Sequence, residues 1–151
     1  MFLLDTNVVS ELRSGKPQQS AAVRAWAQGQ PLQQLYLSAV TVMELEMGVL
    51  RMERKDQLQG KVLRRWATAM LEQFDGRVLP FGVETALRCA AMHVPDTKSM
   101  RDSMIAATAL EHGLVLVTRN RADFSAITVK LVNPWEDQPH APPTGSSGHR
   151  P

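Results

Sequence analysis

Four acidic residues, Asp5, Glu44, Asp102 and Asp123, stand close to the predicted end of a strand or the predicted start of a helix. In open α/β sheets, ligands bind at the carboxyl ends of the strands. We therefore expect the four carboxylates to gather at one edge of a sheet. Two such charges about 4 Å apart repel by roughly 4 kcal/mol near a protein surface. A converging cluster of this kind needs a cation.

Each of the four acids, taken alone, also has a purely structural explanation. Asp5 and Asp123 could each cap the N-terminus of a helix. Glu44 follows Thr41 at the spacing of a capping box. Asp102 opens a predicted helix, where a negative charge is favoured by the helix dipole. No single residue decides between a structural role and a catalytic one.

Clustered carboxylates suit particular metal ions and a particular chemistry. Hard oxygen ligands favour Mg²⁺ or Mn²⁺ over zinc, and Mg²⁺ keeps several waters, so some of the acids can act through water. A divalent ion in such a site activates water and neutralises charge on a phosphodiester. Small residues one turn from two of the acids, Gly48 and Ala106, would allow a substrate or another backbone to approach closely.

The hydrophobic pattern predicts the elements that must position these acids. Apolar segments typical of strands lie at 2–4, 35–37, 77–80, 114–117 and 127–132. Helical spacing follows Asp5 and recurs at 20–27, from a cap at Ser38 to 52, at 56–74, 83–93 and 101–112, with a short helical element from Phe124. Because strands alternate with helices, we expect an α/β fold with a parallel sheet flanked by helices.

Composition limits the class of protein. A chain of 151 residues with 44% hydrophobic and 21% charged residues is typical of one soluble domain, and no apolar run is long enough for a membrane span. The single cysteine excludes an internal disulfide and a cysteine-rich zinc site. We expect a cytoplasmic protein with a domain at 1–137. A tail rich in Pro, Gly and Ser, residues 138–151, is expected to be disordered.

The acids also lie in four short motifs that occur in a characteristic order. The motifs are Asp5-Thr6-Asn7, Thr41-x-x-Glu44-x-x-x-Gly48, Asp102-x-x-Ile105-Ala106-Ala107-Thr108-Ala109 and Thr118-Arg119-Asn120-x-x-Asp123-Phe124. This series resembles PIN-domain ribonucleases, in particular the FitB-like branch of the VapC toxins of bacterial type II toxin–antitoxin systems. The ending Val132-Asn133-Pro134-Trp135-Glu136 is similar to that branch too. The resemblance covers residues 1 to about 136.

The resemblance implies a three-layer α/β/α PIN-like domain with a central parallel sheet of about five strands. It implies metal-dependent RNA cleavage with Mg²⁺ or Mn²⁺, a cognate antitoxin as partner, and a homodimer. Asp5, Glu44, Asp102 and Asp123 match the acidic quartet of the family, which is catalytic and binds the metal.

Five further residues match or flank polar positions of these motifs. Thr118 and Asn120 match residues of the fourth motif that position a ligand acid or the water, and Asn7 matches a polar neighbour of the first acid. Arg119 and Arg121 flank Asn120. They could contact RNA phosphates, which gives affinity independent of sequence, or they could be solvated turn residues.

Two other functions stay open at the level of sequence. A Mg²⁺-dependent phosphatase could use Asp5 as a covalent nucleophile, although such enzymes usually carry a second acid two residues later, where this chain has Asn7. A non-catalytic PIN-like binding module could retain the fold alone, although the complete acidic quartet counts against it.

Overall fold

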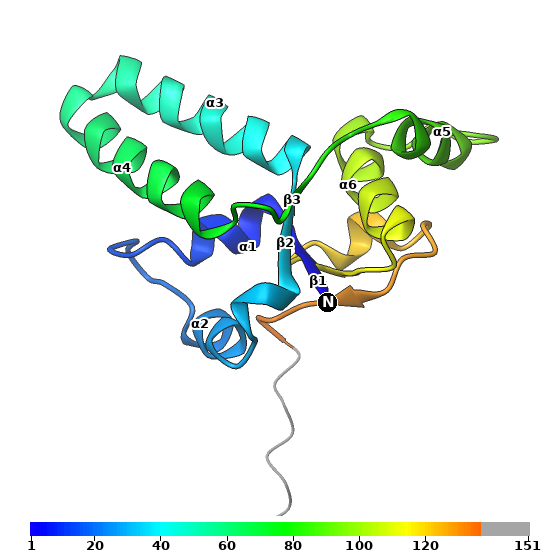
Figure 1. Cartoon of the computed structure of the whole chain (residues 1–151), viewed down its shortest axis with the longest axis horizontal. Coiled ribbons are helices and arrows are strands. Elements are labelled where there is room, and N and C mark those ends of the chain that lie inside the picture. Colours follow the sequence, from blue (N-terminus) through cyan, green and yellow to red (C-terminus); the bar gives the residue numbers. More distant parts are fainter. Residues whose placement is uncertain (137–151) are drawn as a thin grey trace, which may run out of the picture.

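Five short strands form one parallel sheet in the computed structural model, which describes residues 1–136 (Figure 1). The strands are β1 (Phe2–Leu4), β2 (Leu35–Ser38), β3 (Val78–Leu79), β4 (Val115–Val117) and β5 (Leu131–Val132). Their order is β3-β2-β1-β4-β5, and every neighbouring pair is parallel. The predicted parallel sheet is therefore confirmed. The predicted tail at 138–151 lies outside the described residues.

Six α-helices and two short 3-10 helices connect these strands in the described part of the chain. They are α1 (Thr6–Glu11), α2 (Ala21–Gln28), η1 (Leu32–Gln34), α3 (Ala39–Lys55), α4 (Gln57–Gln73), α5 (Val83–Met92), α6 (Met100–Glu111) and η2 (Arg121–Phe124). None of these helices has the length and apolar character needed to cross a membrane. The predicted α-helices are confirmed to within a few residues.

Two predicted boundaries near the C-terminus are wrong. The last strand contains only Leu131 and Val132, because the amide of Val129 turns back to bond the carbonyl of Ile127 at 2.9 Å. The short helical element ends at Phe124 instead of beginning there. Both differences arise where backbone turns, which leave little trace in the hydrophobic pattern, replace extended chain.

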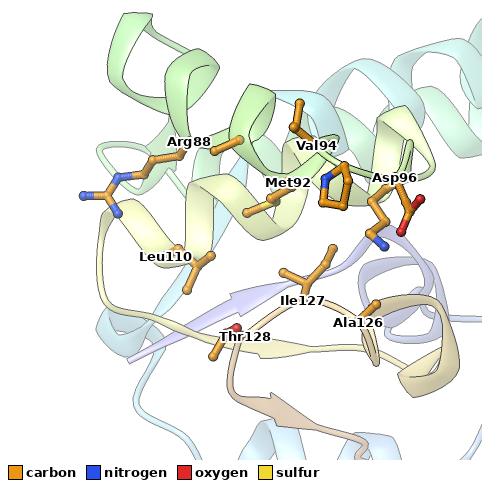
Figure 2. A pocket seen from close by; sticks show the side chains of 11 residues that line it. Arg88, Met92, Val94, Asp96, Leu110, Ala126, Ile127 and Thr128 are labelled. Atoms are coloured by element: carbon orange, nitrogen blue, oxygen red, sulfur yellow. The ribbon is translucent and has the colours of Figure 1, made fainter.

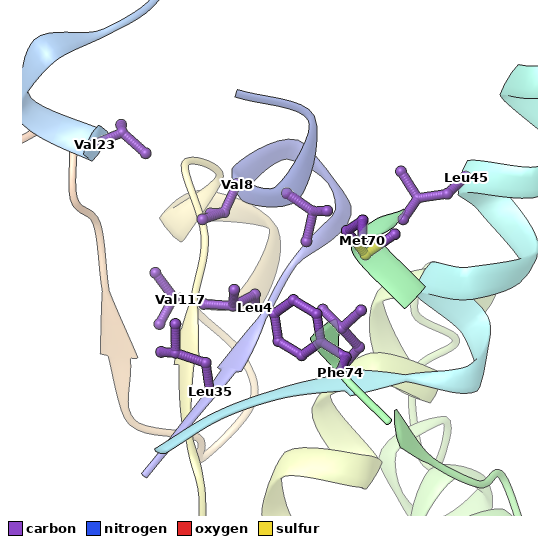
Figure 3. Close-up of a cluster of buried hydrophobic side chains, with 10 residues drawn as sticks. Leu4, Val8, Val23, Leu35, Leu45, Met70, Phe74 and Val117 are labelled. Atoms are coloured by element: carbon purple, nitrogen blue, oxygen red, sulfur yellow. The ribbon is translucent and has the colours of Figure 1, made fainter. Parts of the chain in front are cut away.

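The helices cover the sheet in two layers. Alternate strand residues point to opposite faces. Leu4, Leu37 and Val117 pack with Val8 and Phe74 on the face covered by α1, α2 and α4 (Figure 3). Their neighbours Leu3 and Leu116 point to the other face, where they join Ile105 and Ala106 of α6. The molecule is therefore a three-layer α/β/α domain.

The start of α3 decides the structural explanation of Glu44. The N-cap is Ser38, whose hydroxyl accepts the amide hydrogen of Thr41 at 3.0 Å. Glu44 lies six residues after this cap, beyond the reach of a capping box. The capping-box interpretation of Glu44 is wrong, so its carboxylate is free for other contacts.

A tight hairpin of α3 and α4 extends from the sheet (Figure 1). At its closed end, a β-carbon added to Gly60 would lie 2.5 Å from the Cα of Glu53. Arg64 of α4 binds both Glu46 and Glu53 of α3, at 2.6 and 2.7 Å. The close backbone approach thus occurs at Gly60. At Gly48 an added β-carbon meets nothing within 4 Å, so the expected approach of another backbone is wrong there, whereas the expected approach of a substrate stays a prediction.

Replacement of Gly60 by alanine is expected to lower the free energy of unfolding by about 1–3 kcal/mol, because the new methyl group meets backbone that can only move with α3. Gly48→Ala is the matched control. It places the same methyl group in open space inside a helix, so it should leave stability unchanged or raise it by about 0.5–1 kcal/mol. Urea unfolding followed by circular dichroism measures both. Equal effects of the two substitutions would contradict the close approach.

The buried carboxylate of Glu11 ties the end of α1 to the start of α2. It accepts hydrogen bonds from the ammonium group of Lys16 at 2.5 Å and from the amide of Ser20 at 2.6 Å. These two bonds lower the pKa of Glu11, and burial opposes them only in part. Because the folded-state pKa is depressed, the charged carboxylate stabilises the fold above its unfolded pKa of about 4.3. That stability is lost as the pH falls through the folded pKa.

Glu11→Gln should therefore lower the free energy of unfolding at pH 7 by about 1–3 kcal/mol, since a buried ion-paired acceptor loses its charge. The difference from the wild type should shrink as the pH falls below about 4, where the wild-type carboxylate becomes protonated too. Urea unfolding across pH 3–7 measures this. A difference that is constant over that range would show that the charge of Glu11 does not contribute.

Candidate active site

Asp5 lies at the point where the strand order reverses, because β2 and β4 flank β1 on opposite sides. Open α/β sheets bind their ligands at such switch points. The amide of Asp5 bonds the carbonyl of Val117, and its fully buried carboxylate accepts the hydroxyl of Thr118 at 2.8 Å. The amide of Thr6 donates to the same carboxylate at 2.7 Å, so Asp5 is also the N-cap of α1. The capping explanation of Asp5 is confirmed, and the role of Asp5 in a site stays a prediction.

Two polar side chains that follow Asp5 extend the site. The amide group of Asn7 lies 3.4 Å from the second carboxylate oxygen of Asp5. The hydroxyl of Thr6 donates to Glu44 at 2.8 Å and lies 3.2 Å from the hydroxyl of Thr41. Thr6 therefore links the first acid to the second across α1 and α3, a role that sequence reasoning missed.

The guanidinium of Arg101 joins three of the predicted acids. Its Nη2 donates to Asp5 at 2.7 Å, and its Nε donates to Glu44 at 2.6 Å. Its Nη1 donates to Asp102 at 2.8 Å. The three carboxylates come from the end of β1, from α3 and from α6, so one side chain ties together segments nearly a hundred residues apart. Asp5, Glu44 and Asp102 thus meet at the predicted edge.

Arg101 was not among the residues that the sequence singled out. One signal was available. It stands in the first turn of α6, where the helix dipole disfavours a positive charge, so its position calls for an anionic partner. Burial alone would lower the pKa of Arg101, but the hydrogen bond to Glu44 and the charge of Asp5 outweigh it and raise the pKa. The guanidinium supplies positive charge that the clustered carboxylates require.

The fourth predicted acid is not among those that Arg101 binds. Asp123 is exposed in η2, and within residues 1–136 the ion pairs of Arg101 go to Asp5, Glu44 and Asp102. Asn120 is exposed as well, and its amide donates to the hydroxyl of Thr118 at 3.1 Å. The fourth motif therefore reaches the cluster through Thr118.

The C-terminal segment packs against this same motif. The guanidinium of Arg119 lies over the ring of Trp135 at 5.1 Å, and its carbonyl accepts the side-chain amide of Asn133 at 3.3 Å. The amide of Arg119 approaches Asn7 at 3.4 Å. Arg119 therefore has a structural role in holding the fourth motif beside the first, whereas Arg121 is exposed on η2.

A hollow of about 200 Å³ adjoins one of the predicted acids, Glu44. Thr6 and Glu44 line it together with Arg13, Lys16 and Trp66. It brings positive charge and an aromatic ring next to the acidic cluster, which suits a nucleic-acid strand.

A larger hollow of about 460 Å³ lies between α5, α6 and residues 126–128 (Figure 2). None of the predicted site residues lines it. Asp96 lines this second hollow.

The fold and these acids define a PIN domain, and the family model described as "PIN domain" matches residues 2–130. The chain therefore belongs to the PIN-domain family. It also matches VapC-type proteins along nearly their whole length. It is 37% identical to the VapC ribonuclease Y4jK of Sinorhizobium fredii, over 90% of this chain and 99% of that protein. It is 39% identical to the toxin FitB of Neisseria gonorrhoeae, over 91% of this chain and 100% of FitB.

Solved structures of FitB complexes are also similar to this chain. The crystal structure of FitAcB from Neisseria gonorrhoeae superposes with a TM-score of 0.82 at 37% identity, covering 90% of this chain and 99% of that one. The structure of FitAB bound to the IR36 DNA fragment superposes with a TM-score of 0.79 at 35% identity, covering 93% and 100%. The resemblance to the FitB-like branch of the VapC toxins is confirmed.

Proposed function

We propose that this protein is a metal-dependent endoribonuclease, the toxin of a type II toxin–antitoxin system acting in the bacterial cytoplasm. The observation that carries the proposal is the meeting of Asp5, Glu44 and Asp102 at the switch point of a PIN fold. Two relatives, one named as a VapC ribonuclease and the other as a toxin, match this chain over at least nine tenths of its length.

The side chains around Asp5 fit Mg²⁺ or Mn²⁺. They offer carboxylate and hydroxyl oxygens, the ligands that these hard ions prefer. We propose that Asp5, Glu44 and Asp102 hold the ion directly and that Asp123 acts through water. When bound, such an ion activates water for hydrolysis and neutralises charge on the scissile phosphate.

The remaining residues would orient these acids and the RNA. Thr118 donates to one oxygen of Asp5 and so fixes the plane of that carboxylate. Thr6 does the same for Glu44. Arg13 lines the hollow next to Glu44, where it would attract an RNA phosphate. Asn120 and Arg121 follow Thr118 in the chain and are exposed, and we propose that they contact the RNA.

An antitoxin partner and a homodimer are part of the proposal. Solved relatives at 26% identity or more include a toxin–antitoxin complex from Klebsiella pneumoniae. Here a largely apolar hollow of about 480 Å³ lies between α1, α2 and α4, with Trp66, Leu12 and Leu32 in its lining. It would accept an apolar segment of the antitoxin. The exposed Val83 and Leu87 on α5 offer a separate surface for a second copy of this chain.

The first test compares RNA cleavage by the free full chain with Mg²⁺ or Mn²⁺ and with EDTA. Asp5→Asn should reduce cleavage to the EDTA level, because the central buried carboxylate loses its charge and one acceptor oxygen. Asp75→Asn is the matched control: it makes the same change on an exposed turn and should keep wild-type activity. Cleavage that survives Asp5→Asn would sink the proposal. Metal-dependent hydrolysis of a phosphomonoester without RNA cleavage would support the phosphatase instead, and the absence of both activities would support the binding module.

The second test separates Asp123 from the buried acids. Because Asp123 is exposed, is not bound by Arg101 and is proposed to act through water, Asp123→Asn should lower the cleavage rate by about 10–100-fold, the usual loss for a residue that contacts a metal site indirectly. Asp102→Asn should bring the rate to the EDTA level. Initial rates on one RNA substrate at saturating Mn²⁺ measure both. Equal, complete losses would place Asp123 among the direct ligands.

A further inference from the structure

The contacts of Arg101 occupy the positions that a metal ion would need. Three of its five N–H groups bind one oxygen each on Glu44, Asp102 and Asp5. The planar guanidinium stands between the three acids and holds them apart. Within residues 1–136, no group of three acidic, histidine or cysteine side chains is close enough to hold a metal ion. A divalent ion binds oxygens at about 2.0–2.2 Å, so the acids must close in to share one.

We infer that Arg101 competes with the divalent ion for Asp5, Glu44 and Asp102, and thereby sets the metal affinity of the site. The inference rests on the proposed function in that it takes these acids to be the metal site. Arg101 and the ion exchange: the guanidinium leaves as the ion enters, and it returns when the ion dissociates.

The surroundings of Arg101 permit this exchange. Its side chain is 34% exposed, so it can swing into solvent without crossing the core. It lies in the first turn of α6, where the helix dipole opposes a positive charge, so the three acids are what hold it inward. Within residues 1–136, the hydrogen bonds and ion pairs of the Arg101 side chain all go to these three acids.

Charge decides the direction of the exchange. Three ionised carboxylates carry three negative charges, and one guanidinium leaves an excess of two. A divalent ion leaves an excess of one, so it is the stronger partner when it is abundant. When metal is scarce, Arg101 binds the acids instead, because it belongs to the same chain and is always next to them. If Arg101 occupies the acids in about nine of ten molecules, the apparent Kd for the ion is about tenfold higher than the intrinsic value.

The experiment measures Mn²⁺ binding to the full chain, free of antitoxin, by the electron paramagnetic resonance of unbound Mn²⁺. Arg101→Gln should bind Mn²⁺ about tenfold more tightly than the wild type. Arg88→Gln is the matched control: it removes the same charge from an exposed arginine that is paired with Glu84, and it should leave the Kd unchanged. Asp5→Asn, alone and combined with Arg101→Gln, identifies the binding at this site.

A second readout follows stability. In EDTA, Arg101→Gln should melt at a lower temperature than the wild type, and Mn²⁺ should raise its melting temperature by more than it raises that of the wild type. The single ammonium group of Arg101→Lys cannot span three carboxylates, so its melting temperature in EDTA should lie between those of the wild type and Arg101→Gln. If Arg101→Gln does not fold in EDTA, Arg101→Lys is used in its place.

Equal or weaker Mn²⁺ binding by Arg101→Gln would overturn the inference, and weaker binding would make Arg101 a residue that supports the metal. This test and the test of the proposed function can fail independently of each other. Tighter Mn²⁺ binding by Arg101→Gln in a chain that cleaves no RNA would support the exchange and contradict the proposed ribonuclease activity. Cleavage that depends on Asp5, with unchanged Mn²⁺ affinity in Arg101→Gln, would do the reverse.

Discussion

The repulsion between carboxylates at one buried edge is the constraint on which the site depends. Asp5 is fully buried, and Asp102 nearly so, at the end of a sheet. An isolated buried charge is costly, so such groups must be paired and hydrogen-bonded. Asp5 meets this condition with donors from Thr6, Thr118 and Arg101, which come from three separate segments. The edge of the sheet can carry these acids only because each finds its donors there.

Parallel topology explains why donors from distant segments reach one place. β1 and β4 pair in register, so the residues that follow them, Asp5 and Thr118, emerge side by side. The reversal of strand order between these strands leaves a crevice that no crossover covers. Tight packing on both faces of the sheet, with Leu3 and Leu4 pointing to opposite sides, fixes the register. The position of the carboxylates is therefore a consequence of the core.

The sequence was sufficient for the features that depend on local patterns. Apolar spacing predicted the strands and helices, and their alternation predicted the parallel sheet and the edge at which Asp5, Glu44 and Asp102 meet. It was not sufficient for contacts between distant segments. Arg101 reads as one charge among many until Asp5 and Glu44 are seen to converge on it. Asp123 shows the same limit, because its position depends on the path of a turn that apolar spacing does not encode.

The contacts of Arg101 also explain how clustered carboxylates can exist in a stable fold. Acids that bind a divalent ion are mutually repulsive without it, so the chain would have to fold against that repulsion whenever metal is scarce. A guanidinium from α6 removes much of the penalty and closes the contact between α6, α3 and the end of β1. In the exchange that we propose, the same guanidinium that stabilises the fold opposes the ion, since both need the same oxygens. Stability of the fold without the ion and affinity for the ion would then be set against each other through a single side chain.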